Sequence, residues 1–179
     1  MTETKGTLYL VPTPIGNLED MTYRAVRVLQ EVHTIAAEDT RHSGLLLKHF
    51  DIKKPLISYH EHNKDAKEEP LMELLLSGHD VAVISDAGMP AISDPGADLV
   101  LAAIDAGIPV VPLPGPNAAL TALIASGLDT REFTFLGFLP KKSSHRKELL
   151  ERVVHMKALY CSTKRLIVYK LHYRSYINI

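Results

Sequence analysis

The stretch 81–96 most constrains what this chain can fold into. It begins with an apolar run, Val81–Ile84, which is short enough to be a strand buried on both faces of a parallel sheet. Small and polar residues follow at once, among them Asp86 and Gly88. We interpret Asp94, which directly precedes a proline, as the N-cap of the next helix. Ligands of open α/β sheets bind where such strands end, so this loop is the first candidate for a binding site.

The same order of apolar run, polar end and helix recurs along the chain. Strands are predicted at 7–11, 34–37, 56–59, 81–84 and 108–111, with helices between them and a further, aromatic strand at 133–139. Short connections between alternating strands and helices imply right-handed crossovers. We therefore predict an α/β fold: a mainly parallel five-stranded sheet with flanking helices at 1–116, followed by a truncated second α/β domain at 117–179.

Local signals predict where the helices begin and end. Asp20 is the expected cap of a helix whose apolar positions are Ala25, Val28, Leu29 and Val32. Further helices are predicted at 43–50 and 65–77, the regular part of the latter beginning close to Pro70 and ending at Gly78. In the helix after residue 96 we expect Val100, Ala103 and Ile104 to face inward. Asn117 is the expected cap of an alanine-rich helix through Ala125.

Composition limits the classes of partner. The 179 residues carry a formal net charge of −1, so no global field attracts the chain to nucleic acid or membrane, and any RNA binding must depend on a local basic patch. Cys161 is the only cysteine, which excludes an intrachain disulfide. A polar N-terminus and the lack of a long apolar run predict a cytoplasmic protein with no signal peptide and no membrane span.

Familiar phosphate-binding motifs are missing. The loop after the first strand has no Gly-x-Gly-x-x-Gly pattern, and no Gly-Lys-Ser/Thr motif occurs anywhere in the chain. The strand ends carry instead loops bounded by proline and glycine, which hold backbone groups rigidly. Such loops suit an adenosine-like group better than a polyphosphate.

Six ordered motifs give the chain a recognisable pattern. They are Pro12–Asp20, Ala37–Arg41, Ser58–Asn63, Ser85–Pro90, Ile92–Gly96 and Pro114–Asn117. Together they resemble the tetrapyrrole methylase superfamily and, within it, the ribosomal RNA small subunit methyltransferase I branch, from Gly6 to Leu150. The resemblance implies S-adenosyl-L-methionine-dependent 2′-O-methylation of a cytidine ribose in 16S rRNA. It also implies a homodimer that acts on 16S rRNA or the small ribosomal subunit, with the cofactor in a cleft between two α/β domains.

The resemblance also assigns site residues. The cofactor-binding candidates are Ile15, Asp86, Gly88, Ala91, Gly115 and Pro116, although Asp86 stands where the superfamily more often has a glycine-aspartate-proline loop. Methyl transfer to a ribose hydroxyl needs a base within hydrogen-bond reach of its proton. The candidates are Glu38, Asp39 and His60, which follow predicted strands. The substrate-binding candidates are Arg41, His62, Asn63, Lys141, Lys142 and Arg146.

Each of these residues also has a structural interpretation. Glu38, Asp39 and Arg41 could simply form an ion pair at a loop, and Gly115 and Pro116 could be a turn only. The lysines near 141 could be the solvated start of a helix that Ser143 or Ser144 caps. Tyr59 could stack on a base, although packing is the commoner role of a tyrosine at a strand end. His60 and His62 share one strand face without a third protein ligand, so no metal is expected.

The end of the sequence departs from the family pattern. The resemblance fades near Val153, and the strand-like pieces within 158–170 do not align with it. We therefore expect a truncated form, with a change of reading frame near residue 157 as one explanation. Two other functions stay open: a methyltransferase that acts on a small tetrapyrrole, and a non-catalytic dimerising remnant of an enzyme.

Overall fold

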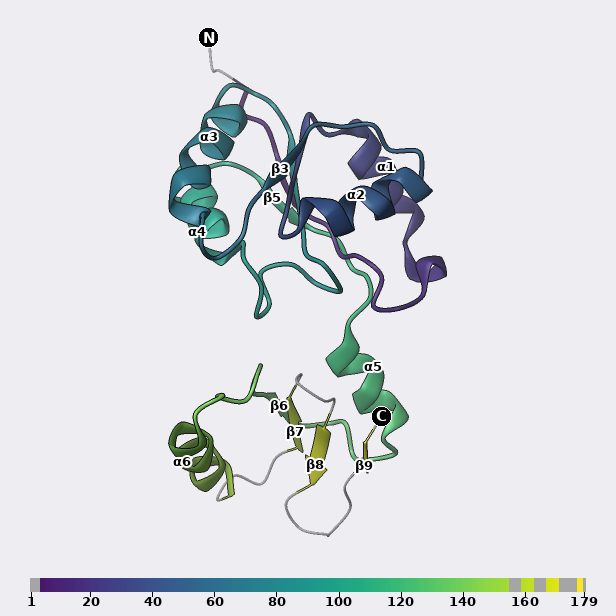
Figure 1. The fold of residues 1–179 in the computed structure, drawn as a ribbon, viewed down its shortest axis with the longest axis vertical. Coiled ribbons are helices and arrows are strands. Elements are labelled where there is room, and N and C mark those ends of the chain that lie inside the picture. The colour runs from purple at the N-terminus through teal and green to yellow at the C-terminus, as the bar shows by residue number, and fades with distance from the viewer. Residues whose placement is uncertain (1–3, 155–158, 163–166, 171–176, 179) are drawn as a thin grey trace. The chain divides into compact units, whose positions relative to one another are not determined.

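The computed structural model describes residues 4–154, 159–162, 167–170 and 177–178. The chain divides into two compact units, Met1–Pro116 and Asn117–Ile179 (Figure 1). The first unit contains a five-stranded sheet in the order β3-β2-β4-β1-β5, and every pair of neighbouring strands is parallel. The predicted α/β fold with a parallel five-stranded sheet and flanking helices is confirmed.

The elements of the first unit follow the predicted alternation. The strands are β1 (Leu8–Leu10), β2 (Thr34–Ala37), β3 (Leu56–Ser58), β4 (Val81–Ile84) and β5 (Val110–Pro112). The helices are the 3₁₀-helix η1 (Leu18–Asp20), α1 (Tyr23–Glu31), α2 (Thr40–His49), α3 (Lys64–Leu76) and α4 (Ala97–Asp105). Each crossover returns the chain to the same edge of the sheet, so the carboxyl ends of the strands lie together.

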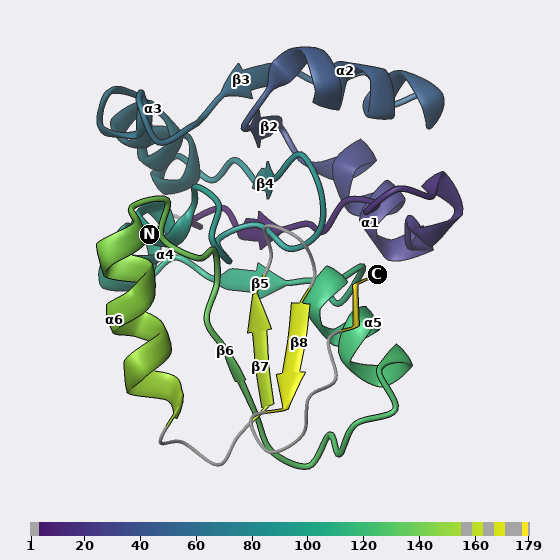
Figure 2. The same cartoon turned by 60° about the horizontal axis from the view of Figure 1, so that its bottom comes forward.

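The sheet is buried on both faces. All four residues of β4 are buried, and they alternate between two apolar clusters: Ala82 and Ile84 belong to one, Val81 and Val83 to the other. Helices α1 and α2 cover the first face and α3 and α4 the second (Figure 2). This arrangement explains the continuous apolar run of β4, since neither face meets solvent.

The described part of the second unit contains six elements. They are α5 (Ala118–Ala125), β6 (Phe133–Phe135), α6 (Ser143–Val154), β7 (Leu159–Ser162), β8 (Ile167–Lys170) and β9 (Ile177–Asn178). The strands form a sheet in the order β6-β7-β8-β9, parallel between β6 and β7 and antiparallel elsewhere. Asn117 caps α5 as predicted, because its side chain accepts a hydrogen bond from the Leu120 N–H.

Two predicted helix caps are wrong. The cap of α1 is Thr22, whose hydroxyl accepts from the Ala25 N–H at 3.0 Å, whereas Asp20 ends η1. The N-cap position of α4 is Gly96, not Asp94, and the helix begins at Ala97. Gly96 has a φ of +129°, which favours glycine. The dipeptide Asp94-Pro95 alone does not predict this backbone conformation. The Asp94 carboxylate is therefore not used to cap the helix.

Two expectations about helix interiors are also wrong. Helix α3 begins at Lys64 and carries Pro70 inside it. Ala66, whose carbonyl loses its usual donor to the proline, is exposed, so water can serve that carbonyl. In α4 the buried stripe consists of Leu99 and Ala103, whereas Ile104 is 58% exposed. Among the described residues no helix has the length and apolar character needed to cross a membrane.

Candidate functional site

The loops after β1 and β4 are joined at the carboxyl edge of the sheet. Thr13 and Gly88 exchange two backbone hydrogen bonds, at 3.0 and 2.9 Å. The Thr13 hydroxyl donates to the Ser85 carbonyl at 2.9 Å, and both residues are 1% exposed. The Ser85 hydroxyl in turn donates to the Gly88 carbonyl at 3.2 Å. These buried bonds hold the β4 loop against the β1 loop.

A glycine lies where three loops meet. A Cβ built on Gly88 would lie 3.4 Å from Ile15 Cγ2 and 3.6 Å from the Pro116 carbonyl oxygen, and Gly88 has a φ of +83°. A Cβ on Gly115 would lie only 2.7 Å from Pro12 Cβ. We call Ile15, Gly88, Gly115 and Pro116 the glycine cradle, since β1, β4 and β5 are neighbours in the sheet and their loops bring these residues together.

The rest of the β4 loop has an unusual backbone conformation. Ala91 and Ser93 both have a φ of +63°, which costs about 1–3 kcal/mol each for residues other than glycine. A Cβ on Gly96 would lie 3.5 Å from Ala91 Cβ, so the loop folds back on itself. Such conformations persist only where the surrounding structure imposes them, and they are frequent at ligand-binding sites.

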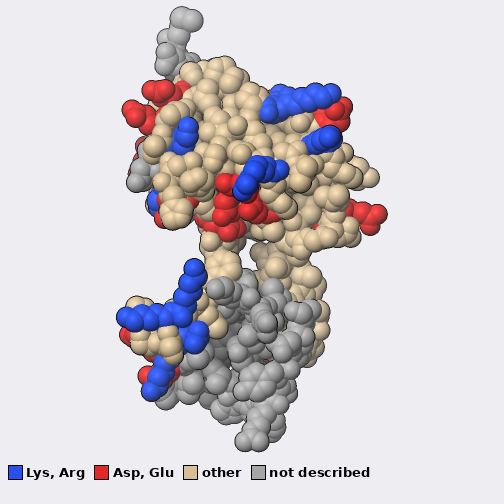
Figure 3. Space-filling view, in the orientation of Figure 1, with Lys and Arg blue, Asp and Glu red and all other residues tan. Residues whose placement is uncertain are grey.

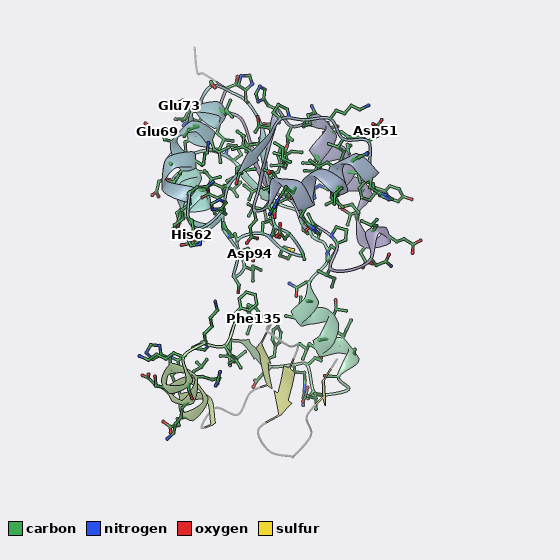
Figure 4. The ribbon with its side chains drawn as sticks, in the orientation of Figure 1. Asp51, His62, Glu69, Glu73, Asp94 and Phe135 are labelled. Carbon is green, nitrogen blue, oxygen red and sulfur yellow. The ribbon has the colours of Figure 1, made fainter. Side chains whose placement is uncertain are left out.

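Carboxylates gather on the other half of this edge, at the ends of β2 and β4. We call Glu38, Asp86 and Asp94 the acidic edge. Figure 3 shows acidic side chains gathered at the lower edge of the first unit, and Figure 4 labels Asp94 there. Burial and the charges of Glu38 and Asp86 raise the pKa of Asp94 to about 6. Burial and then the Asp86 charge also raise the pKa of Glu38.

The backbone acts on two of the three carboxylates. Asp86 Oδ1 accepts a hydrogen bond from the Asp39 N–H at 3.2 Å. The backbone of Asp86 lowers the pKa of Glu38, but burial and the Asp86 charge outweigh this effect. The Asp39–Asp86 hydrogen bond ties the ends of β2 and β4. The Asp94 carboxylate receives no hydrogen bond from any residue that the structure describes, and only burial and charge act on its pKa.

Asp39 and Arg41 form a local pair. Asp39 is the N-cap of α2, which begins earlier than the predicted 43–50, and its Oδ1 accepts from the Arg41 N–H at 2.8 Å. Arg41 Nη2 donates to Asp39 Oδ2 at 3.0 Å. These hydrogen bonds lower the pKa of Asp39 to about 2. A carboxylate with so low a pKa is a weak base, so Asp39 is poorly suited to accept a proton near neutral pH. The Arg41 side chain is 91% exposed.

The segment after β3 places two imidazoles at the same edge. The His60 N–H donates to Asn63 Oδ1 at 2.8 Å, and Asn63 Nδ2 donates to the Ser58 carbonyl at 3.1 Å, so Asn63 holds this turn. The ring centroids of His60 and His62 are 6.1 Å apart. His60 Nδ1 is buried without a hydrogen-bond partner. No group of three or more potential metal ligands occurs among the described residues.

Tyr59 is a core residue. It is 1% exposed and packs in the cluster that contains Leu71, Leu75 and Leu99. Burial raises the pKa of its hydroxyl to about 12. Its ring is therefore not available to stack on a base, in agreement with the packing interpretation.

Basic side chains gather on the second unit. Lys141, Lys142 and Arg146 are all exposed at the start of α6, which begins at Ser143. Figure 3 shows a group of Lys and Arg side chains over α6. Lys147 forms an ion pair with Glu151 at 3.7 Å, so part of the positive charge of the helix is compensated.

Sequence reasoning misses two residues of this edge and gives a third the wrong main role. Thr13 and Ser85 are buried polar residues inside recognised motifs, and their small hydroxyls give no chemical signal of their own. For Asp94 the sequence favours a helix cap over direct ligand contact, because an aspartate before a proline is typical of helix starts. Only the tertiary structure places it beside Glu38 and Asp86.

Comparisons with known proteins agree on one family. The family model described as Tetrapyrrole (Corrin/Porphyrin) Methylases matches residues 7–172. The chain is similar to proteins named "Ribosomal RNA small subunit methyltransferase I". It is 58% identical to the protein of Halalkalibacterium halodurans over 154 residues, which cover 86% of this chain and 53% of that protein. With the Haemophilus influenzae protein the identity is 53% over 153 residues, covering 86% and 54%. The chain spans about half the length of these curated relatives.

The fold of this chain is also similar to that of solved structures. The crystal structure of uroporphyrin-III-C-methyltransferase from Thermus thermophilus matches with a TM-score of 0.58 and 28% identity, covering 82% of this chain and 72% of that one. A crystal structure of diphthine synthase matches with a TM-score of 0.70 over 89% of this chain and 65% of that one. At 14% identity, the second match is evidence of a shared fold only.

Proposed function

Because this chain belongs to the tetrapyrrole methylase family, we propose that it transfers a methyl group from S-adenosyl-L-methionine to the 2′-hydroxyl of a cytidine ribose in 16S rRNA. The proposal depends mainly on one observation: the sequence of this chain is 51–61% identical to proteins named as small-subunit rRNA methyltransferases. The identity to the uroporphyrin-III-C-methyltransferase is only 28%, which favours RNA over a small tetrapyrrole as the substrate.

The glycine cradle supports the assignment of the cofactor. At Gly88 a side chain would extend toward Ile15 and Pro116, so the missing Cβ leaves room for a flat group to approach the backbone. The proposed cofactor contacts are Ile15, Asp86, Gly88, Ala91, Gly115 and Pro116. The neighbouring carboxylates of Glu38 and Asp86 suit the positive charge of a sulfonium.

For methyl transfer the chain must align the methyl donor with the ribose hydroxyl and must accept the proton of that hydroxyl. The bound cofactor supplies an electrophilic methyl group, so the protein needs no covalent intermediate. The cradle would orient the donor, and the tied ends of β2 and β4 would hold the hydroxyl in line with it. Among the catalytic candidates, Glu38 and His60 face this edge, while Asp39 is occupied by Arg41 and is better suited to positioning.

RNA would be held by groups outside the cradle. Arg41, His62 and Asn63 follow β2 and β3, where they could contact the ribose and its phosphates. Lys141, Lys142 and Arg146 would add phosphate contacts, which make binding salt-dependent. We also propose that the protein acts in the cytoplasm as a homodimer on the small ribosomal subunit. Light scattering of the purified chain measures that oligomeric state directly.

Two measurements test the proposed function. Calorimetric titration of the 179-residue chain with S-adenosyl-L-methionine should give saturable heat. Incubation with the tritiated methyl donor and small ribosomal subunits should label 16S rRNA at a ribose, which primer extension at low nucleotide concentration locates. Absence of both heat and label would reject the enzyme, and label on a uroporphyrinogen-type acceptor in place of RNA would move the substrate to the tetrapyrroles.

A further inference from the structure

Four carboxylates lie at the carboxyl edge of the sheet, and three of them are already engaged by the protein. Asp39 is held by Arg41, and Asp86 accepts from the Asp39 N–H. The backbone of Asp86 acts on Glu38. Asp94 differs from these three, because no donor among the described residues reaches it. Its lone pairs are therefore free to accept a hydrogen bond from a bound molecule.

The position of Asp94 links it to the proposed reaction. It lies on the loop that also carries Gly88 and Ala91, two of the proposed cofactor contacts, and it does not cap the helix that follows. Ser93, directly before it, has a φ of +63°, and Gly96, two residues later, has a φ of +129°. Two residues with positive φ, Ser93 and Gly96, thus bound the short segment that carries this carboxylate, and the helix N-cap is Gly96 and not Asp94.

We propose that Asp94 is the group that accepts the proton of the substrate hydroxyl during methyl transfer. This inference rests on the proposed function and identifies the base that the sequence left open. In the step, the hydroxyl oxygen bonds to the methyl carbon while the electron pair of the broken carbon–sulfur bond stays on sulfur. The hydroxyl proton moves to a carboxylate oxygen of Asp94 and is then released to solvent.

Burial and like charge give Asp94 the chemistry of a base near neutral pH. The groups that face it are Glu38 from the end of β2 and Asp86 from the end of β4, and their charges together with burial raise its pKa to about 6. His60 at the end of β3 acts on Glu38. A base whose pKa lies just below the working pH is ionised and still accepts a proton readily.

The test compares Asp94→Asn with the wild-type chain and with Asp105→Asn, the same change at an exposed site on α4. We expect Asp94→Asn to bind S-adenosyl-L-methionine with a Kd within about threefold of wild type but to lower kcat by about 10²–10⁴-fold. Asp105→Asn should change neither quantity. Asp94→Glu should recover part of the rate, and the wild-type kcat should rise with pH through about pH 6, a dependence that Asp94→Asn loses.

A measurement without turnover accompanies the kinetics. In ¹³C-carboxyl NMR of aspartate-labelled protein, one resonance should titrate near pH 6 and should be missing from Asp94→Asn. An Asp94→Asn variant that keeps more than a third of the wild-type rate overturns the proposal, and so does one that loses cofactor binding, which would make Asp94 a cofactor ligand. A wild-type chain that neither binds the cofactor nor transfers the methyl group rejects the proposed function itself.

Discussion

The backbone N–H of Asp39 donates a hydrogen bond to Asp86 Oδ1 at 3.2 Å, across residues that are far apart in the sequence. The contact joins the loop that opens α2 to the loop that follows β4. The two strand ends cannot separate without losing this bond. Asp86 therefore supports the edge of the site from a position next to Ser85 and the glycine cradle.

This contact predicts a difference between two substitutions at one residue. Asp86→Ala removes the acceptor and leaves the Asp39 N–H unpaired, whereas Asp86→Asn keeps an oxygen in place, and both remove the charge. We expect Asp86→Ala to lower the free energy of unfolding by about 1–2 kcal/mol more than Asp86→Asn does. Urea denaturation measures the difference. Equal values for the two variants would mean that this hydrogen bond does not stabilise the fold.

Much of the fold could be predicted because local pattern and tertiary environment agree. Val81–Ile84 is continuously apolar because both faces of the sheet are covered, and Asn117 caps α5 because its signal acts within one helical turn. In a parallel sheet the carboxyl ends of the strands share one edge, so the sequence also predicts that the polar strand ends lie together.

The remaining features depend on contacts between distant residues. The pattern Asp94-Pro95 is typical of a helix start, but α4 begins after Gly96, whose φ of +129° follows from its packing against Ala91 and Val83. In the same way, Thr22 and not Asp20 caps α1. Pro70 lies inside α3, where the residue four positions earlier, Ala66, is exposed. The raised pKa of Asp94 results from burial and from the charges of Glu38 and Asp86. No local sequence pattern predicts that these three residues lie near one another.

Substitution of Gly88 should affect both cofactor binding and folding stability, and the two effects can be measured separately. Gly88→Ala imposes a φ of +83° on a residue with a Cβ and places that atom 3.4 Å from Ile15 Cγ2. We expect a loss of stability of about 1–2 kcal/mol together with at least a tenfold weaker binding of S-adenosyl-L-methionine. Calorimetry and thermal denaturation measure the two effects.

Gly44→Ala is the matched control for that experiment. Gly44 lies inside α2 with nothing within 4 Å of an added Cβ. The change should stabilise the chain by about 0.5–1 kcal/mol and leave cofactor binding unchanged. If Gly88→Ala binds the cofactor as well as Gly44→Ala does, the cradle is not the cofactor site.

The buried hydroxyl of Thr13 should contribute to stability. Thr13→Val keeps the shape of the side chain but removes the donor to the Ser85 carbonyl, in a place that is 1% exposed. The expected loss is about 1–2 kcal/mol. Thr121→Val removes a hydroxyl that donates to the Asn117 carbonyl on the exposed side of α5 and should cost less than about 0.5 kcal/mol. Equal losses of stability in the two variants would mean that burial does not increase the contribution of the Thr13 hydrogen bond.

The acidic edge should make stability depend on pH. Burial and like charge raise the pKa of Asp94 from 3.8 to about 6 on folding, so the folded chain holds a proton that the unfolded chain has lost between these values. Stability should therefore fall as pH rises from about 4 to about 6 and change little through this group above that.

Asp94→Asn removes that dependence. The variant should have a higher Tm than the wild type at pH 7.5 and a nearly equal Tm at pH 3.5, because only the ionised carboxylate is penalised by burial beside Glu38 and Asp86. Scanning calorimetry of both proteins across this range measures the difference. Asp105→Asn should follow the wild type, and a lower Tm for Asp94→Asn at pH 7.5 would show that its carboxylate is stabilising after all.

The basic start of α6 should determine how RNA binding responds to salt. Each side chain that contacts a phosphate adds about 0.7–0.9 to the slope of log K against log salt concentration. Replacing Lys141, Lys142 and Arg146 together by glutamine should reduce that slope by about 2 and weaken binding to small ribosomal subunits at low salt. The control replaces Lys48, Lys53 and Lys54, which changes the net charge equally on the first unit. If the two triple variants respond alike, only net charge matters and α6 makes no specific contact with RNA.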